Sequence, residues 1–238
     1  MSSRQIEVCL TPALINLYEN LPDKIVVIID ILRATSTICT AFQKGAIKVI
    51  TIGSIEEAMM LKNKGYLVAA ERHGQKVEGF EIGNSPTQLF QMDLKDQCFA
   101  ITTTNGTKAV EMTKNAYRIT IGSFLNITAL SVWLKNQQRD IILLCAGWKD
   151  QFNLEDTLFA GALISRLKSN FEISCDAGIA SEKLYISAKD NLYDFLKGSS
   201  HFKRLSGFGV EDDIKFCLKH DLLLSVPVFN GEAFVLMS

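Results

Sequence analysis

The stretch KIVVIIDILRATSTICTAFQKG, residues 24–45, decides the fold. Its first part is a run of mostly β-branched residues that is apolar on both faces, which is typical of a buried strand in a parallel sheet. Its second part has helical spacing and closes on Gly45, a common way for a helix to end. One acid, Asp30, stands at the junction. A buried strand followed directly by a helix is the unit from which α/β proteins are built.

The same strand-then-helix unit recurs along the chain and predicts an α/β fold. Because several runs are apolar on both faces, we expect a largely parallel sheet covered by helices. The last third differs: residues 180–220 are predicted to be helical, and residues 222–238 to form a hairpin around Asn230-Gly231. The predicted strands are residues 6–10, 25–30, 46–52, 67–70, 98–102, 117–122 and 140–147, and the predicted helices are residues 35–45, 54–65, 85–92, 106–116, 126–137 and 153–170.

Length and composition narrow the class of protein. The 238 residues are interpreted as a single domain over 1–238, with a subdomain boundary near residue 170 as the alternative. The net charge of −1 gives no overall attraction to nucleic acid or to an acidic membrane. We find no signal peptide and no apolar run near the roughly 18 residues that span a bilayer.

The cysteines and histidines also limit the chemistry. Six scattered cysteines without a C-x-x-C pair are typical of core residues in a reducing compartment, so we expect a cytoplasmic protein. The three histidines, His73, His201 and His220, lack the spacing of zinc ligands. A homo-oligomer is compatible with the sequence, which does not decide the oligomeric state.

Polar residues gather where the predicted strands end. Asp30 closes the strand at 25–30, Glu71 and Arg72 follow the one at 67–70, and the block TTNGTK follows the one at 98–102. The carboxyl ends of parallel strands share one edge of a sheet, which is where open α/β proteins bind their ligands. We therefore expect these residues to converge on one cleft.

The residue types at that edge suit a small anion. Helix starts offer free N–H groups to phosphate or carboxylate, but each contributes only about 0.3–1 kcal/mol when exposed, so arginines or a metal must assist. Carboxylates beside an anion need a cation between them, and oxygen ligands without His or Cys suit Mg²⁺. The candidate substrate-binding residues at helix starts are Thr35, Ser36, Gly83, Asn84, Ser85, Thr104, Asn105, Gly106, Thr107 and Lys108.

The loop ERHGQKVEGFEIGNSP, residues 71–86, is long for a simple turn. We predict that it carries Glu71 and Arg72 over an anion to the helix start at Ser85. Its glycines would let the backbone approach the ligand closely. The alternatives are a surface ion pair between Glu71 and Arg72, glycines that serve turn geometry alone, and a Ser85 that only caps the next helix.

Five blocks of sequence carry a resemblance to a known family: DILRATS (30–36), ERHGQKVEGFEIGNSP (71–86), TTTNGT (102–107), CAG (145–147) with NLED (153–156), and HFKRLSGFGVEDD (201–213). Together they resemble the 2-phosphosulfolactate phosphatase family. The resemblance runs from about residue 5 to the C-terminus and implies a three-layer α/β/α fold. It also implies Mg²⁺-dependent hydrolysis of 2-phospho-3-sulfolactate to sulfolactate and phosphate, a step towards coenzyme M.

The hypothesis that joins these observations is a Mg²⁺-dependent phosphatase of a small anionic substrate. Asp30 and one or both of Glu155 and Asp156 would hold the metal, and either water or Asp30 would attack the phosphorus. Arg33, Arg72 and the amides of residues 105–107 would bind the phosphate oxygens. Glu71 completes the candidate catalytic set, which is Asp30, Arg33, Glu71 and Arg72.

Each of these residues could instead have a purely structural role. Asp30 could cap the next helix, and Arg33 could pair with Asp30. Glu155 and Asp156 could be ordinary acids of a first helical turn, with Asn153 as the cap. His201 and Asp213 are interpreted as mainly structural. The rival functions are hydrolysis of another 2-phospho-acid and a non-enzymatic anion-binding module.

Overall fold

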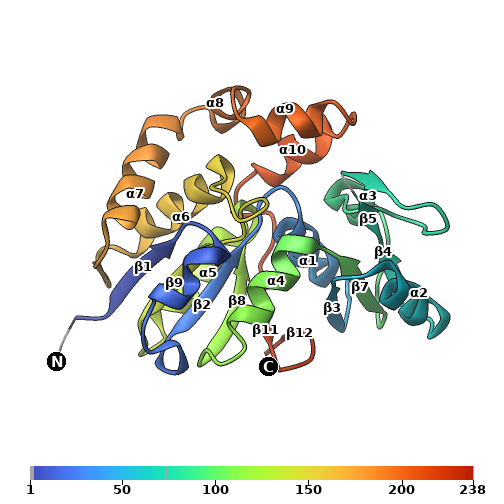
Figure 1. The fold of residues 1–238 in the computed structure, drawn as a ribbon, viewed down its shortest axis with the longest axis horizontal. Helices are drawn as coiled ribbons and strands as arrows, with labels where there is room; N and C mark the ends of the chain where they lie inside the picture. The colour runs from blue at the N-terminus through green and yellow to red at the C-terminus, as the bar shows by residue number, and fades with distance from the viewer. Residues whose placement is uncertain (1–2, 73, 238) are drawn as a thin grey trace.

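The computed structural model describes residues 3–72 and 74–237, so His73 lies outside the described residues. The predicted α/β fold is confirmed: a large, mostly parallel sheet stands between helices (Figure 1). Within the described residues the sheet has ten strands, in the order β10 (Glu172–Ile173), β1 (Gln5–Cys9), β9 (Ile141–Cys145), β2 (Ile25–Ile29), β8 (Arg118–Gly122), β11 (Pro227–Phe229), β12 (Phe234–Leu236), β3 (Lys48–Ile52), β7 (Cys98–Thr102) and β4 (Leu67–Ala69).

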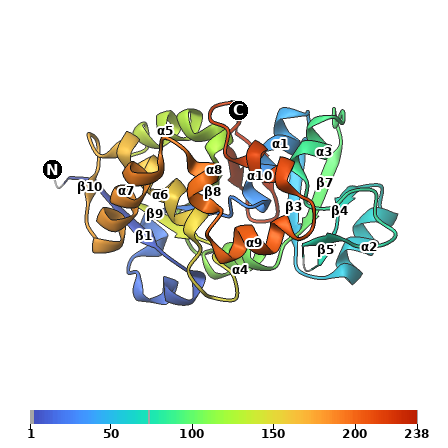
Figure 2. The same ribbon diagram turned by 90° about the horizontal axis from the view of Figure 1, so that it is seen from above.

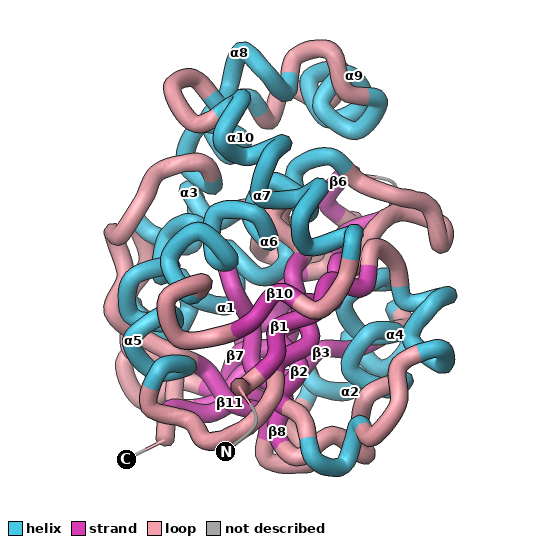
Figure 3. The backbone as a smooth tube through the Cα atoms, turned by 90° about the vertical axis from the view of Figure 1, so that its left-hand side faces the viewer, coloured by secondary structure: helices cyan, strands magenta, loops and turns pink. Residues whose placement is uncertain are grey.

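Helices cover the sheet because its strands are apolar on both faces. In β2, Ile25, Val27 and Ile29 pack into a core shared with α5 (Ile127–Lys135) and α6 (Leu154–Leu167). The alternate residues Val26 and Ile28 pack into a second core that includes side chains of α1 (Ala34–Gln43) and α4 (Thr104–Met112). Figure 3 shows the strands in magenta with helices on either side. The remaining helices of this part are α2 (Ile55–Asn63) and α3 (Pro86–Phe90).

The first of the C-terminal helices packs against α6 and β1, and the other three lie over the carboxyl edge of the sheet (Figure 1). The C-terminal helices are α7 (Asp176–Ala188), α8 (Leu192–Leu196), α9 (Ser200–Ser206) and α10 (Glu211–Cys217). Seen from above, α8, α9 and α10 lie across the middle of the molecule (Figure 2). Core residues on both sides of residue 170, from Ile6 to Leu218, belong to one cluster. The interpretation as a single domain stays a prediction.

The predicted C-terminal hairpin is confirmed, but its place in the fold was not foreseen. Strand β11 pairs with β8, and β12 pairs with β3, both antiparallel. The hairpin therefore joins two otherwise parallel halves of the sheet, β10-β1-β9-β2-β8 and β3-β7-β4.

Several short elements have no counterpart in the sequence-based expectations, among them β10 and a 3-10 helix at Leu21–Asp23. Strands β5 (Glu71–Arg72) and β6 (Gln75–Lys76) make a small hairpin inside the glycine loop. A 3-10 helix covers Pro12–Leu17. One capping expectation is wrong: Asn153 occupies the N-cap position of α6, but its side chain accepts no capping hydrogen bond.

No helix among the residues that the structure describes is both long enough and apolar enough to cross a membrane. All six cysteines are free thiols.

His220 predicts a pH dependence of stability that is separate from the site. Its ring lies against Phe124, with ring centroids 4.9 Å apart, and burial lowers its pKa, as does the neighbouring Arg166, while Asp221 opposes them. A histidine whose folded pKa lies below its unfolded value destabilises the fold once it is protonated. Stability is therefore lost as the pH falls through the unfolded value of about 6.5.

Between pH 7.5 and pH 5.0, we expect the urea midpoint of the wild type to fall further than that of His220→Gln. The glutamine cannot take up a proton, so the difference between the two falls isolates this group. Equal falls in the two proteins would show that His220 does not contribute.

Candidate active site

A cavity of about 400 Å³ opens at the carboxyl edge of the sheet, where the polar residues were predicted to converge. It lies under the C-terminal helices, which supply part of its wall. Residues far apart in the sequence thus line one space, which supports the expectation of a single cleft. Of the residues singled out in the sequence, the lining includes Asp30, Arg33, Glu71, Arg72, Asn84, Thr104 and Asn105.

Asp30 lies at the end of β2, in a turn that leads into α1. Its main-chain oxygen accepts hydrogen bonds from the N–H of Thr35 at 3.0 Å and from Thr35 Oγ1 at 2.9 Å, which fixes the turn. Its Oδ1 receives only a long hydrogen bond, 3.4 Å, from the N–H of Ala34. Its Oδ2 faces the first turn of α4, since a Cβ placed on Gly106 would lie 3.7 Å from it. The carboxylate is therefore largely free to act on a ligand.

The surroundings of Asp30 disfavour its charge. Burial, helped by the carboxylates of Glu155 and Glu71 and opposed by His201 and the N–H of Ala34, raises its pKa to about 6. The charges of Glu155 and Glu71 are thus near enough to Asp30 to disfavour its ionised form. A bound metal ion would reverse this effect, because it stabilises ionised carboxylates.

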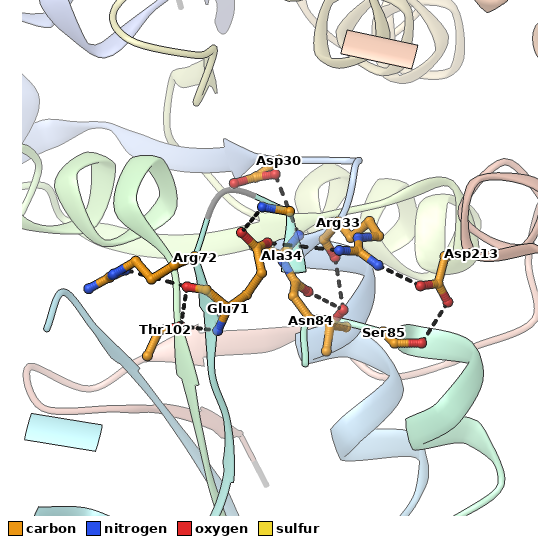
Figure 4. Close-up of polar contacts among 11 residues, drawn as sticks. Asp30, Arg33, Ala34, Glu71, Arg72, Asn84, Ser85, Thr102 and Asp213 are labelled. Atoms are coloured by element: carbon orange, nitrogen blue, oxygen red, sulfur yellow. Dashed lines mark hydrogen bonds and ion pairs between the residues drawn. The ribbon is translucent and has the colours of Figure 1, made fainter. Parts of the chain in front are cut away.

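Arg33 is held from two sides. Its Nη1 donates to Asp213 Oδ2 at 2.6 Å, and its Nη2 lies 3.8 Å from Glu71 Oε2 (Figure 4). Both Arg33 and Asp213 are only 4 % exposed, so the pair is buried. The alternative pairing of Arg33 with Asp30 is not the one that forms.

Asp213 ties α10 to the start of α3. Its Oδ1 accepts hydrogen bonds from Ser85 Oγ at 2.8 Å, from the N–H of Thr87 at 3.1 Å and from Thr87 Oγ1 at 2.5 Å. Ser85 also caps α3 by accepting the N–H of Gln88 at 3.3 Å, as predicted. The carboxylate therefore fixes both the arginine and the helix start beside it.

The glycine loop places Glu71 and Arg72 at the rim of the cavity. The N–H of Glu71 donates to Thr102 Oγ1 at 2.8 Å, and Glu71 Oε1 accepts the N–H of Gly74 at 2.7 Å. Arg72 Nη1 donates to the carbonyl of Glu71 at 3.5 Å (Figure 4), and its Nη2 donates to the carbonyl of Gly53 at 2.7 Å. Among the described residues no ion pair joins Glu71 to Arg72, so the surface-pair alternative is not what forms.

The two acids at the start of α6 have different partners. Glu155 is fully buried; its Oε1 contacts His201 Nδ1, and its Oε2 has no partner among the described residues. Asp156 accepts the N–H of Ile31 at 2.9 Å and the N–H of Gly147 at 3.1 Å, one on each oxygen. Burial raises the pKa of Asp156 well above its ordinary value, together with Glu155 and Asp30. Asp156 thus anchors the loops after β2 and β9.

The remaining predicted residues lie around the cavity rather than on its wall. Thr35 and Ser36 bond to main-chain oxygens of Asp30 and Ile31. Thr103 caps α4 by accepting the N–H of Gly106 at 3.1 Å, and Lys108 pairs with Asp150 on the surface. Gly83 and Ser85 line a neighbouring groove instead of the cavity. The predicted site residues that do not line the cavity are Thr35, Ser36, Gly83, Ser85, Gly106, Thr107, Lys108 and the two predicted metal ligands Glu155 and Asp156.

Sequence reasoning undervalued the wall that the C-terminal layer supplies. His201 and Arg204 of α9, and Phe208 after it, line the cavity, as do Trp148 and Lys149 after β9. Phe208 packs on the glycine loop, since a Cβ on Gly74 would lie 2.6 Å from its ring. The signal that could have found these residues is the block HFKRLSGFGVEDD, which contains three of them and Asp213.

Comparison with known proteins shows which family of sequences this chain is similar to. The profile described as 2-phosphosulpholactate phosphatase matches residues 9–232. A protein of Thermotoga maritima named "Probable 2-phosphosulfolactate phosphatase" is 42 % identical over 210 residues, covering 88 % of this chain and 91 % of its own. Proteins with the same name from Caldanaerobacter subterraneus subsp. tengcongensis (40 %, 87 % and 88 % covered) and Symbiobacterium thermophilum (36 %, 92 % and 97 % covered) are similar along nearly their whole length.

Proposed function

The chain belongs to the 2-phosphosulfolactate phosphatase family, and from this premise we propose that it hydrolyses 2-phospho-3-sulfolactate to 3-sulfolactate and phosphate with the help of Mg²⁺. The observation that supports the proposal most is the single cavity that holds Asp30, Arg33, Arg72 and the start of α4. A carboxylate, two guanidinium groups and free helix N–H groups are the set that phosphoryl transfer needs. Formation of coenzyme M, as the fate of the product, is part of the same proposal.

Of the three acids predicted from the sequence to hold Mg²⁺, two have carboxylate oxygens that could bind it. Asp30 lines the cavity with a nearly free carboxylate, and Glu155 has one buried oxygen without a partner. Asp156 is left out of the proposal because both of its oxygens accept main-chain N–H groups. No group of three or more His, Cys, Asp or Glu side chains among the described residues is arranged as a metal cage.

The metal, when bound, neutralises charge on the phosphate oxygens. Asp30 acts on one side of the phosphorus, either as the nucleophile or by orienting a water. The N–H groups at the start of α4, beside Thr104 and Asn105, face the phosphate oxygens. Arg33, fixed by Asp213, and Arg72 supply positive charge from two further elements. His201 is held at Nδ1 by Glu155, which leaves Nε2 as the ring nitrogen that can meet the substrate.

Phosphate release tests the function. We expect the protein to release phosphate from 2-phospho-3-sulfolactate in the presence of Mg²⁺, to stop when EDTA is added, and to resume with excess Mg²⁺. Values of kcat/KM for phospholactate and phosphoglycerate should be lower. Tight binding without release would favour the anion-binding module, and a higher value for another 2-phospho-acid would replace the substrate.

Arg72→Ala is expected to lower kcat/KM at least about tenfold, because a charge-assisted hydrogen bond to the phosphate is lost. The fold should persist, since the side chain bonds only to main-chain oxygens at the rim. Arg139→Ala is the matched control: this exposed arginine precedes β9, at the opposite edge of the sheet. An unchanged kcat/KM in Arg72→Ala would remove Arg72 from the site.

A further inference from the structure

Two cations on the cavity wall have no acidic partner. Arg204, on α9, and Lys149, in the turn after β9, line the same cavity as Asp30. Neither forms an ion pair with any side chain in the described part of the chain. Arg33, by contrast, is already paired with Asp213, and Arg72 bonds to the carbonyl of Gly53. Arg204 and Lys149 are therefore positive charges that no ion pair among the described residues neutralises.

Both cations lie against the indole ring of Trp148. The guanidinium carbon of Arg204 is 3.9 Å from the ring centroid, and Lys149 Nζ is 4.6 Å from it. Stacking on an aromatic face orients a guanidinium without using its N–H donors. Burial lowers the pKa of Arg204, with Glu155 and Glu71 opposing this effect, so its charge is poorly hydrated and gains from an anion. It nevertheless stays protonated at neutral pH.

The loop that presents Trp148 is rigidly built. The N–H of Trp148 donates to the carbonyl of Gln151 at 3.1 Å, and the reverse hydrogen bond is 3.0 Å long. Lys149 and Asp150 between them have φ of 51° and 58°, as in a two-residue hairpin turn. Gly147 has φ of 61°, and a Cβ there would lie 2.3 Å from the Gln151 carbonyl, so only glycine fits. Its N–H is held by Asp156, which gives that buried acid a role in this turn.

We propose that Trp148, Lys149 and Arg204 form a subsite that binds the sulfonate of the substrate, a proposal that rests on the function proposed above. The phosphate belongs beside Asp30 and the start of α4, and the carboxylate sits on the same carbon as the phosphate ester. The sulfonate is one carbon further away and needs a separate positive region. Arg204 follows His201 by three residues, so it lies one helical turn from the residue beside Glu155 and Asp30.

The chemistry of the subsite matches a sulfonate. A weakly hydrated anion pairs well with a guanidinium group, which is itself less strongly hydrated than an ammonium group. Arg204 presents several N–H donors to three equivalent oxygens, and the indole face of Trp148 can cover the adjacent methylene carbon. In this proposal the carboxyl edge of the sheet binds the phosphate, and α9 together with the turn after β9 binds the sulfonate.

The subsite is tested by measuring kcat/KM of variants on two substrates, one with the sulfonate and one without it. Phospholactate lacks the sulfonate but keeps the phosphate and carboxylate. We expect Arg204→Met to lower kcat/KM for 2-phospho-3-sulfolactate by about 10- to 100-fold. For phospholactate the loss should be less than about threefold, because the contact that is removed does not exist there. Arg204→Lys should recover part of the loss. Lys203→Met, an exposed neighbour on the same helix, is the control and should change neither value.

Failure of this inference differs from failure of the proposed function. Equal losses of Arg204→Met on both substrates, or no loss on either, overturn the subsite while the wild type still releases phosphate. Absence of release from 2-phospho-3-sulfolactate by the wild type would instead overturn the function.

A binding measurement gives a readout without turnover. The chain has two tryptophans, so Trp133→Phe makes Trp148 the only fluorescent indole. We expect sulfoacetate to change this fluorescence saturably, and Arg204→Met in that background to raise its Kd by about the same factor as it lowers kcat/KM. An unchanged Kd would contradict the subsite.

Discussion

Replacing Asp30 by asparagine is expected to reduce kcat/KM about a thousandfold or more. The amide keeps the shape of the side chain but can neither attack phosphorus nor bind Mg²⁺ strongly, so the central step loses its reacting group. The measurement is Mg²⁺-dependent phosphate release at pH 7.5. Asp190→Asn, an exposed acid on the C-terminal side, is the control and should keep full activity. A variant that retains a tenth of the wild-type value would remove Asp30 from the reacting centre.

The same variant separates a chemical role for Asp30 from a structural one. Burial raises the pKa of Asp30 to about 6 in the metal-free protein, so the folded state holds the proton more tightly than the unfolded chain does. The ionised carboxylate then destabilises the fold, and stability falls as the pH rises from about 4 to about 6. Asparagine removes that charge. We expect the urea midpoint of the metal-free Asp30→Asn protein at pH 7.5 to equal or exceed that of the wild type.

Asp213→Asn is expected to lower the free energy of unfolding by about 3–5 kcal/mol. Asp213 is buried, and without its charge the buried guanidinium of Arg33 keeps only the more distant carboxylate of Glu71, 3.8 Å away, as a counter-ion. Breaking one partner of a buried pair costs about this much because the remaining charge is neither hydrated nor neutralised. Urea unfolding at pH 7.5 measures the loss. The control is Asp212→Asn, the exposed neighbour on α10, which should change stability by less than about 0.5 kcal/mol.

A double-mutant cycle makes this prediction specific to the pair. Arg33→Met with Asp213→Leu removes both charges, so it should be more stable than Asp213→Leu alone. Activity should not return, because Arg33 itself lines the cavity. If the double variant is less stable than both single variants, the large loss does not come from an unpaired charge.

Much of the fold could be predicted because strands and helices carry their own local signals. The run at residues 25–29 is apolar on both faces because it packs into two cores, and periodicity reports this directly. The convergence of Asp30, Arg72 and Asn105 followed from the rule that parallel strands share a carboxyl edge. Elements such as β5 and β6 escaped because two residues are too few to show a period.

What could not be predicted depends on contacts between distant parts of the chain. The helical pattern at residues 200–217 shows that helices form but not which face meets the cavity, so His201, Arg204 and Asp213 were undervalued. The pairing of Asp213 with Arg33 spans 180 positions, and nothing local in either segment specifies it. The role of Asp156 could not be predicted because acids are common in the first turn of many helices. Only the folded structure shows that it anchors two loops.

The position of the β11–β12 hairpin has a consequence for biosynthesis. A nascent chain that has emerged from the ribosome only as far as residue 226 holds two half-sheets whose edges, β8 and β3, are unpaired. Such edges are templates for association with other chains. The final step of folding must therefore wait until synthesis has delivered residues 227–236, and the longer this takes, the longer the two unpaired edges are open to association with other chains.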